Sequence, residues 1–234
     1  MKRTAKHWID PGLRAANVRE VDIGGQVLAR LDPLVPALQA MTPGTKALEA
    51  GGIALSVSRP KGWGSDVAWI SQADVAAFAF FDALFAELDL ARQFTPYIAC
   101  DRAPVLYSGF FVTRSRSTGG GWHYDWIDGN NDGFTLIAPI SANCAELGLA
   151  YHDLRGEERR LDYRRGKGVV FGDHFHHATA PGETAQPTVL LSLSFGTDRL
   201  ERWHRLSATA AHQGLMHRRP DGIFVHSGKP VSPP

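Results

Sequence analysis

The triplet His123-Tyr124-Asp125 is the first part of the sequence that could do chemistry. Its imidazole and carboxylate stand two residues apart, so on a β-strand both side chains leave the same face. Such a pair can supply two ligands to one metal ion. A chain with 10 histidines contains His-x-Asp by chance, so the triplet gains weight only from its context. It follows the Ser/Gly-rich loop 115–121, and more histidines lie downstream.

Those downstream histidines are candidates for a third ligand. His174, His176 and His177 stand within the segment 171–181. Two histidines and one carboxylate on one face of a metal leave coordination positions open, and this is the ligand set of non-haem Fe(II) oxygenases. The sequence contains no His-Glu-x-x-His, no zinc-spaced cysteine pair, no serine nucleophile elbow and no phosphate-binding or dinucleotide glycine motif.

Several motifs across roughly residues 105–197 resemble those of the Fe(II)/2-oxoglutarate-dependent oxygenase superfamily. Trp122-His123-Tyr124-Asp125 is similar to the Trp-His-x-Asp of phytanoyl-CoA-hydroxylase-like members. Phe171-Gly172-Asp173-His174-Phe175-His176-His177 is similar to the Phe-x-Asp-x-Phe-x-His of aspartyl/asparaginyl β-hydroxylases, and the strand-like segment 166–171 resembles the one that precedes the family's distal histidine. The resemblance selects His177 as the third ligand over His174 and His176.

The resemblance implies a fold and an activity. The fold would be mainly β with flanking helices, a double-stranded β-helix of the jelly-roll, cupin-like type. Fe(II) would be held by His123, Asp125 and His177, with 2-oxoglutarate and O₂ as cosubstrates, and an unactivated C–H bond would be hydroxylated. Asp125 favours hydroxylation over halogenation, because related halogenases have a small residue there. The expected substrate is a small molecule such as an amino-acid derivative or natural product.

Three other interpretations stay open. The substrate could be a peptide or protein side chain. The chain could be a cupin-like metal protein that does not use 2-oxoglutarate. It could also be a jelly roll whose histidines bind no metal.

One element of the family pattern is missing. The family usually places an Arg or Lys about ten residues after the distal histidine, where it binds the C5 carboxylate of 2-oxoglutarate, but residues 178–198 contain neither. A buried carboxylate still needs charged or hydrogen-bonding partners. We therefore expect the clamp from Arg114 or Arg116, with Thr188 as a hydroxyl donor and Lys167 as the next candidate. The competing interpretation is that Arg114 and Arg116 are solvated side chains in a serine-rich loop and bind no cosubstrate.

The elements that must position these residues follow from apolar patterning. Apolar runs between turn residues predict strands at 105–113, 121–126, 134–140, 148–152, 168–171 and 188–195. In a strand at 121–126, Trp122, Tyr124 and Trp126 would face away from the metal, where they would pack in the core or, alternatively, contact the substrate. We expect one domain over 1–234, with a helical or irregular part at 1–96, a possible strand at 26–31, an amphipathic helix at 71–92 capped by Ser71, and a closing helix at 198–213.

Composition excludes some classes of partner. The chain has 25 basic and 24 acidic residues, a formal net charge of +1, so it lacks the basic excess typical of nucleic-acid-binding proteins. Cys100 and Cys144 are the only cysteines, which predicts free thiols in a reducing compartment. No export signal and no apolar run long enough for a membrane span is visible. We expect a cytoplasmic protein with a small-molecule partner; composition does not indicate the oligomeric state.

Overall fold

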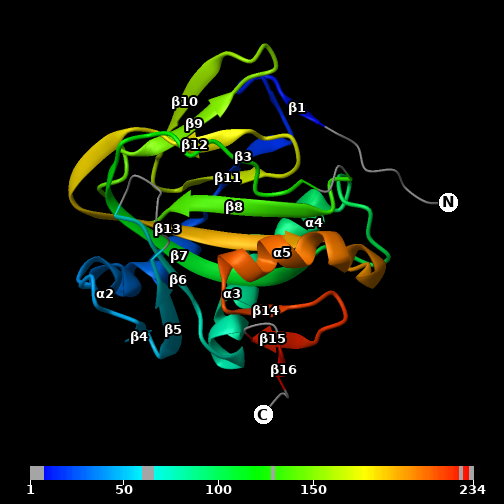
Figure 1. Cartoon of the computed structure of the whole chain (residues 1–234), viewed down its shortest axis with the longest axis horizontal. Coiled ribbons are helices and arrows are strands. Elements are labelled where there is room, and N and C mark those ends of the chain that lie inside the picture. The colour runs from blue at the N-terminus through cyan, green and yellow to red at the C-terminus, as the bar shows by residue number, and fades with distance from the viewer. Residues whose placement is uncertain (1–7, 60–65, 128–129, 227–228, 232–234) are drawn as a thin grey trace.

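The computed structural model describes residues 8–59, 66–127, 130–226 and 229–231, and its architecture is mainly β, as predicted. A large antiparallel sheet faces a smaller three-stranded sheet (Figure 1). The large sheet runs, in spatial order, β3 (Val18–Asp22), β11 (Lys167–Phe171), β8 (Gly133–Pro139), β13 (Gly182–Gly196), β7 (Val105–Ser117), β6 (Ala68–Gln72), β5 (Ile53–Ser58) and β4 (Ala47–Ala50). The small sheet runs β10 (Glu158–Asp162), β9 (Gly148–His152) and β12 (His177–Thr179).

Strand β13 shows how the large sheet separates two environments. Val189, Leu191, Leu193 and Phe195 belong to the core on one face. Leu190 belongs to a second core, which lies between the two sheets. Because side chains alternate along a strand, Thr188, Ser192 and Ser194 share the face of Leu190. Thr188, Ser192 and Ser194 therefore lie on the same side of the large sheet as the second core.

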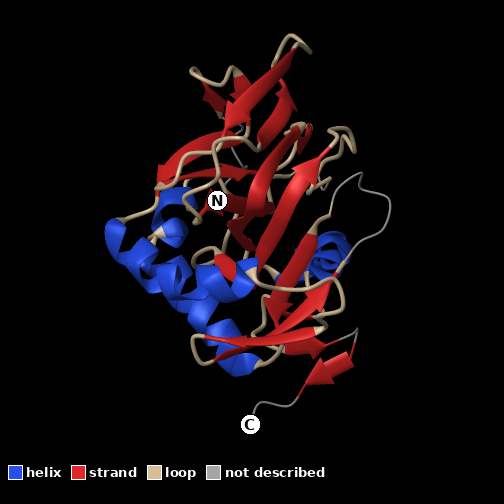
Figure 2. Ribbon diagram, turned by 90° about the vertical axis from the view of Figure 1, so that its left-hand side faces the viewer, coloured by secondary structure: helices blue, strands red, loops and turns tan. Residues whose placement is uncertain are grey.

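Helices cover the first face. Figure 2 shows most helices gathered on one side of the large sheet and one helix on the other. The first group is α1 (Gly25–Leu31), η1 (Asp32–Leu34), α2 (Val35–Gln39), α3 (Val75–Glu87) and α4 (Leu90–Phe94). The single helix is α5 (Trp203–Gln213), preceded by η2 (Leu200–Arg202), and it packs on Tyr107 and Trp126. The expected closing helix is thus confirmed, starting slightly later than predicted.

Short hairpins complete the fold. β1 (Ile9–Asp10) pairs with β2 (Ala15–Ala16). After α5, β14 (Met216–Arg218), β15 (Phe224–His226) and β16 (Lys229–Val231) form a separate sheet. Within the described ranges no helix is long and apolar enough to cross a membrane. Both cysteines are free, as expected.

Several sequence predictions for the N-terminal part are wrong. The segment 26–31 is helical, because Val27 and Leu31 are four residues apart and bury on one helix face. Ser71 lies in β6, and the cap of α3 is Asp74, whose carboxylate accepts a 2.7 Å hydrogen bond from the Ala77 N–H. Residues 1–96 are also not merely helical or irregular, because β3 to β6 extend the large sheet.

The predicted strand at 121–126 is wrong as well. The preceding glycines 119, 120 and 121 all have positive φ, which takes the chain out of extended geometry. In 121–126 only His123 forms a β-bridge, with His177. The predicted strands elsewhere in 105–196 are confirmed as β7, β8, β9, β11 and β13.

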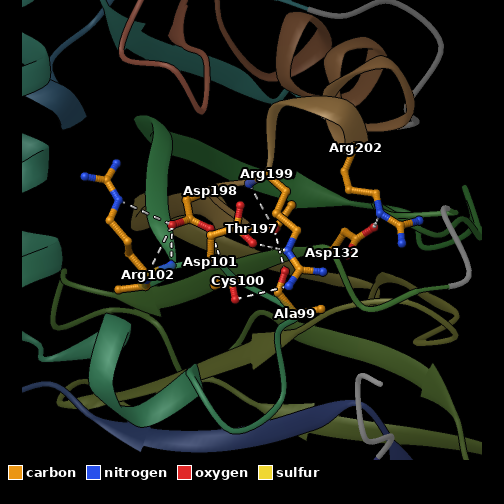
Figure 3. A network of polar contacts seen from close by, with 10 residues as sticks. Ala99, Cys100, Asp101, Arg102, Asp132, Thr197, Asp198, Arg199 and Arg202 are labelled. Carbon is orange, nitrogen blue, oxygen red and sulfur yellow. Dashed lines mark hydrogen bonds and ion pairs between the residues drawn. The ribbon is translucent and has the colours of Figure 1, made fainter. Parts of the chain in front are cut away.

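A polar network anchors the far end of the loop that carries the triplet (Figure 3). The Thr197 N–H donates to the Asp132 carbonyl at 2.8 Å, and the Thr197 hydroxyl donates to the Ala99 carbonyl at 2.7 Å. Arg202 lies 3.8 Å from the Asp132 carboxylate. The Asp198 carboxylate accepts backbone N–H bonds from residues 101 and 102. The loop is therefore fixed to the residue that follows β13 and to the last residue of η2.

The contact between α3 and the sheet predicts a cost for side chains at Gly109. A Cβ atom there would lie 2.1 Å from Cγ of Phe81, so Gly109→Ala forces the helix away from β7. We expect a loss of about 1–3 kcal/mol in the free energy of unfolding, measured by urea denaturation. Gly44→Ala is the control, because nothing lies within 4 Å of a Cβ there. Equal stability of the two variants would contradict the close packing.

His217 predicts a pH dependence of stability. It is buried against Trp203, its Nδ1 has no hydrogen-bond partner in the described structure, and burial lowers its pKa from 6.5 to about 4. As pH falls below 6.5 the unfolded chain takes up the proton first, so stability is lost between pH 6.5 and 4. Between pH 7 and 5 the wild type should lose about 2 kcal/mol more unfolding free energy than His217→Gln. The exposed His204→Gln should keep the wild-type slope; a His217→Gln slope equal to both would refute the assignment.

Candidate metal centre

His123, Asp125 and His177 come together between the two sheets. Their ligand atoms all lie within 4.8 Å of one another. The Asp125 Oδ1 atom is 3.3 Å from Nε2 of His123 and 3.7 Å from Nε2 of His177. Two ligands at right angles on a metal about 2.1 Å away are about 3 Å apart, so the spacing suits one ion. Of the three downstream histidines, the structure brings His177 to this cluster.

Backbone pairing holds the two histidines side by side. The His123 N–H donates to the His177 carbonyl at 2.9 Å, and the His177 N–H donates back at 3.0 Å. His177 begins β12, which pairs with β9. The ligands of the loop and of the small sheet are therefore fixed by main-chain hydrogen bonds.

Each imidazole is oriented through its Nδ1 atom. Nδ1 of His123 lies 2.6 Å from the Gly121 carbonyl, and Nδ1 of His177 lies 3.0 Å from the Phe175 carbonyl. A carbonyl oxygen can only accept, so Nδ1 of each ring carries a proton, and Nε2 is the ring atom turned toward Asp125.

The Asp125 carboxylate is oriented through its other oxygen. Oδ2 accepts a 2.8 Å hydrogen bond from the Thr135 hydroxyl. The Thr135 oxygen in turn accepts a 3.0 Å bond from the Trp126 indole N–H, so its only proton is directed to Asp125. Oδ1 is left facing the imidazoles.

The pKa shifts of Asp125 and His177 favour a metal-ready charge state, whereas that of His123 favours the protonated imidazole. Burial opposes ionisation of Asp125, but the hydrogen bond with His123 and the two imidazoles hold the carboxyl pKa below its usual value. Burial lowers the pKa of His177 to about 4, so this imidazole is neutral at neutral pH. Burial also opposes protonation of His123, but its hydrogen bond with Asp125 raises that pKa overall. A carboxylate and a neutral imidazole are the forms that bind a divalent metal.

The cluster borders a cavity of about 240 Å³ that also contains Arg114. Arg114 lies on β7 and is 8% exposed, and its guanidinium donates to the Thr179 hydroxyl. Its Nε has no partner among the described residues. Burial lowers the pKa of this guanidinium, yet arginine stays charged at neutral pH. Among the described lining residues, Arg114 is the one permanent cation.

The other residues expected to hold the cosubstrate lie elsewhere. Arg116 is exposed and does not line the cavity. Thr188 is directly opposite Arg114 in the β13–β7 register, but its hydroxyl donates to the Asn143 carbonyl at 2.9 Å. Lys167 is ion-paired with Asp22.

Aromatic residues around the loop differ from expectation. Trp126 is buried against Tyr107, as predicted for a core residue. Tyr124 instead lines the cavity and stacks on His176 at 4.7 Å, because the segment is not a strand.

Sequence reasoning missed His152, which stacks on Trp122 at 4.1 Å and hydrogen-bonds His176 through the Nδ1 atoms at 2.8 Å. Only the pairing of β9 with β12 brings these rings together. The cavity-lining residues Trp69, Tyr163, Thr209, His212 and Gln213 were also not predicted.

Comparison with known proteins shows the fold. No protein-family model and no curated protein matches the chain. Among solved structures, the non-heme α-ketoglutarate-dependent epimerase SnoN from nogalamycin biosynthesis is 9% identical, with 78% of each chain covered and a TM-score of 0.56. EvdO2 from Micromonospora carbonacea var. aurantiaca, complexed with 2-oxoglutarate, is 16% identical over 83% of this chain and 93% of its own, with a TM-score of 0.53. HygX from Streptomyces hygroscopicus, with nickel, 2-oxoglutarate and hygromycin B bound, is 12% identical over 77% and 83%, with a TM-score of 0.50. The chain thus has the double-stranded β-helix fold of the Fe(II)/2-oxoglutarate oxygenases, and it carries a candidate His-x-Asp…His triad within that fold.

Proposed function

We propose that the protein is an Fe(II)/2-oxoglutarate-dependent oxygenase that hydroxylates a C–H bond of a small molecule. The observation that carries the proposal is a buried cation, Arg114, in the same cavity as the triad. A metal centre alone would also suit a cupin-like protein, but a metal centre beside a buried guanidinium suits a chelating keto acid with a distant carboxylate. Iron, when bound, would supply the activation of O₂ and 2-oxoglutarate.

The residues of the chain would bind and orient. His123, Asp125 and His177 would hold the metal through Nε2, Oδ1 and Nε2, and Thr135 keeps the second carboxylate oxygen occupied. Three ligands from one side leave the other coordination positions for the cosubstrates.

Arg114 would bind the C5 carboxylate of 2-oxoglutarate. A buried guanidinium with an unpaired N–H favours an anion strongly, because both charges are otherwise desolvated without compensation. Its position opposite Thr188 is informative, because Thr188 is eleven residues after His177, where the family usually has its own cation. In this chain the neighbouring strand would supply that charge.

A small-molecule substrate is supported by two structural neighbours. SnoN has been solved with Fe³⁺, α-ketoglutarate and nogalamycin RO, and HygX with hygromycin B. The cavity is also only about 240 Å³.

The central test is anaerobic addition of Fe(II) and 2-oxoglutarate. We expect the weak visible charge-transfer band of the chelated keto acid, and succinate once O₂ and a substrate are admitted. Metal-loaded protein that neither binds nor decarboxylates 2-oxoglutarate would shift the assignment to a metal protein that does not use this cosubstrate.

Loss of one ligand should abolish tight metal binding. His177→Ala removes one of three donors, and Mn(II) titration followed by electron paramagnetic resonance should detect no tight site. His176→Ala is the matched control, since its ring stacks on Tyr124 outside the triad, and it should keep wild-type affinity. Full occupancy in His177→Ala would remove this residue from the site.

The orientation of Asp125 predicts a role for Thr135. In Thr135→Val the carboxylate loses its hydrogen bond and can turn, so Mn(II) affinity should fall about 10- to 100-fold. Thr135→Ser keeps the hydroxyl and should restore most of the affinity. Thermal melts control for folding, and equal affinity in the valine and serine variants would contradict the orienting role.

Arg114 and Arg116 form a matched pair for the cosubstrate. Arg114→Ala should weaken 2-oxoglutarate binding to the Mn(II)-loaded protein by roughly one to three orders of magnitude, while metal affinity survives. Arg116→Ala should bind 2-oxoglutarate normally, because Arg116 is exposed and outside the cavity. Wild-type affinity in Arg114→Ala would place the clamp elsewhere.

A further inference from the structure

The mouth of the cavity has exposed apolar side chains. Tyr124 is 41% exposed and Ile127 is 84% exposed, and both line the cavity. Trp69 and Phe110 line it from the large sheet. Large apolar groups left in water beside a cavity are typical of a surface that a ligand covers.

A buried hydroxyl on the floor of the cavity lacks a partner. Ser192 lines the cavity and is 1% exposed, and its Oγ makes no hydrogen bond within the described structure. An unsatisfied buried hydroxyl is costly, so its presence at a cavity wall indicates a partner that binds there. Rotation about the single Cα–Cβ bond is enough to direct this group into the cavity.

Ser192 stands apart from the Arg114–Thr188 pair along β13. It is four residues beyond Thr188, the residue opposite Arg114, which is about 13 Å along the strand. Neither Arg114 nor Thr188 is a hydrogen-bond partner of the Ser192 hydroxyl in the described structure. The hydroxyl is available to a second molecule, and Gln213 of α5 lines the cavity as well.

The cavity offers no further charge for such a molecule. Among the described lining residues only Arg114 and Asp125 carry a full charge at neutral pH, apart from the imidazoles. The proposed function assigns these two to the cosubstrate and the metal. A charged substrate group entering the cavity would be desolvated without a partner.

We infer that the mouth binds an uncharged substrate with an apolar or aromatic body and an oxygen function. The body lies against Tyr124 and Ile127, and a hydroxyl or carbonyl oxygen hydrogen-bonds to Ser192. This inference rests on the proposed function, because it takes Arg114 and Asp125 as occupied.

The test uses four matched probes: benzyl alcohol, toluene, benzoate and benzylammonium. Their binding to the full chain loaded with Zn(II) and 2-oxoglutarate is measured by saturation-transfer NMR. Benzyl alcohol should bind tightest, and the two ions at least about tenfold more weakly. In Ser192→Ala benzyl alcohol should lose about five- to tenfold in affinity and fall to the level of toluene, whose own affinity is unchanged.

Ser108→Ala is the matched control. Ser108 also has a buried hydroxyl without a partner, but it does not line the cavity, so this variant should bind benzyl alcohol as the wild type does. With 2-oxoglutarate bound, equal or tighter binding of either ion, no binding of any probe, or no effect of Ser192→Ala would overturn the inference.

A failure of the proposed function would look different. If 2-oxoglutarate does not bind, benzoate should bind with an affinity that Arg114→Ala removes. The difference in affinity between benzyl alcohol and toluene, compared in the wild type and in Ser192→Ala, tests Ser192 whatever the result with benzoate.

Discussion

The pair of backbone hydrogen bonds between His123 and His177 is the constraint on which the centre depends. These residues belong to different parts of the chain, one in a loop and one at the start of β12. Their reciprocal N–H to carbonyl bonds set the separation of the two rings before any metal is considered. Asp125 then needs only to turn its Oδ1 toward them. The glycines before His123 allow this approach, because their positive φ values bring the loop back onto the small sheet.

Around this pair, neighbouring groups orient the imidazoles and the Asp125 carboxylate and determine which of their atoms carry protons. Carbonyl groups select the imidazole tautomers, and the indole of Trp126 selects the direction of the Thr135 proton. Trp126 itself packs in one cluster with Tyr107 and residues of the helix α5. Strand β13 contributes apolar side chains to the core under the helices and Ser192 to the lining of the cavity. Packing of that core therefore also fixes the position of Ser192 at the cavity.

The sequence predicts some of this and not the rest. Short apolar runs between turn residues are enough to predict β7, β8, β9, β11 and β13, because most of the residues in these runs are buried on both faces of the strand. The sequence singles out His123, Asp125 and His177 by a resemblance of motifs, and the fold brings them within reach. It could not separate Arg114 from Arg116, since one is buried and the other exposed only in the folded structure. The cluster of Tyr124, His176 and His152 depends on the pairing of β9 with β12, a contact between segments that no local pattern specifies.

The register of β13 with β7 has a consequence for how related chains are found. Because Arg114 stands directly opposite Thr188, a cation borne by either strand can project into the same region between the sheets. A search that requires a basic residue at a fixed distance after the distal histidine reads one strand only. Such a search does not find a chain whose basic residue lies on the paired strand. Distant relatives are therefore better compared by which residues pair across the two strands than by the number of residues after the distal histidine.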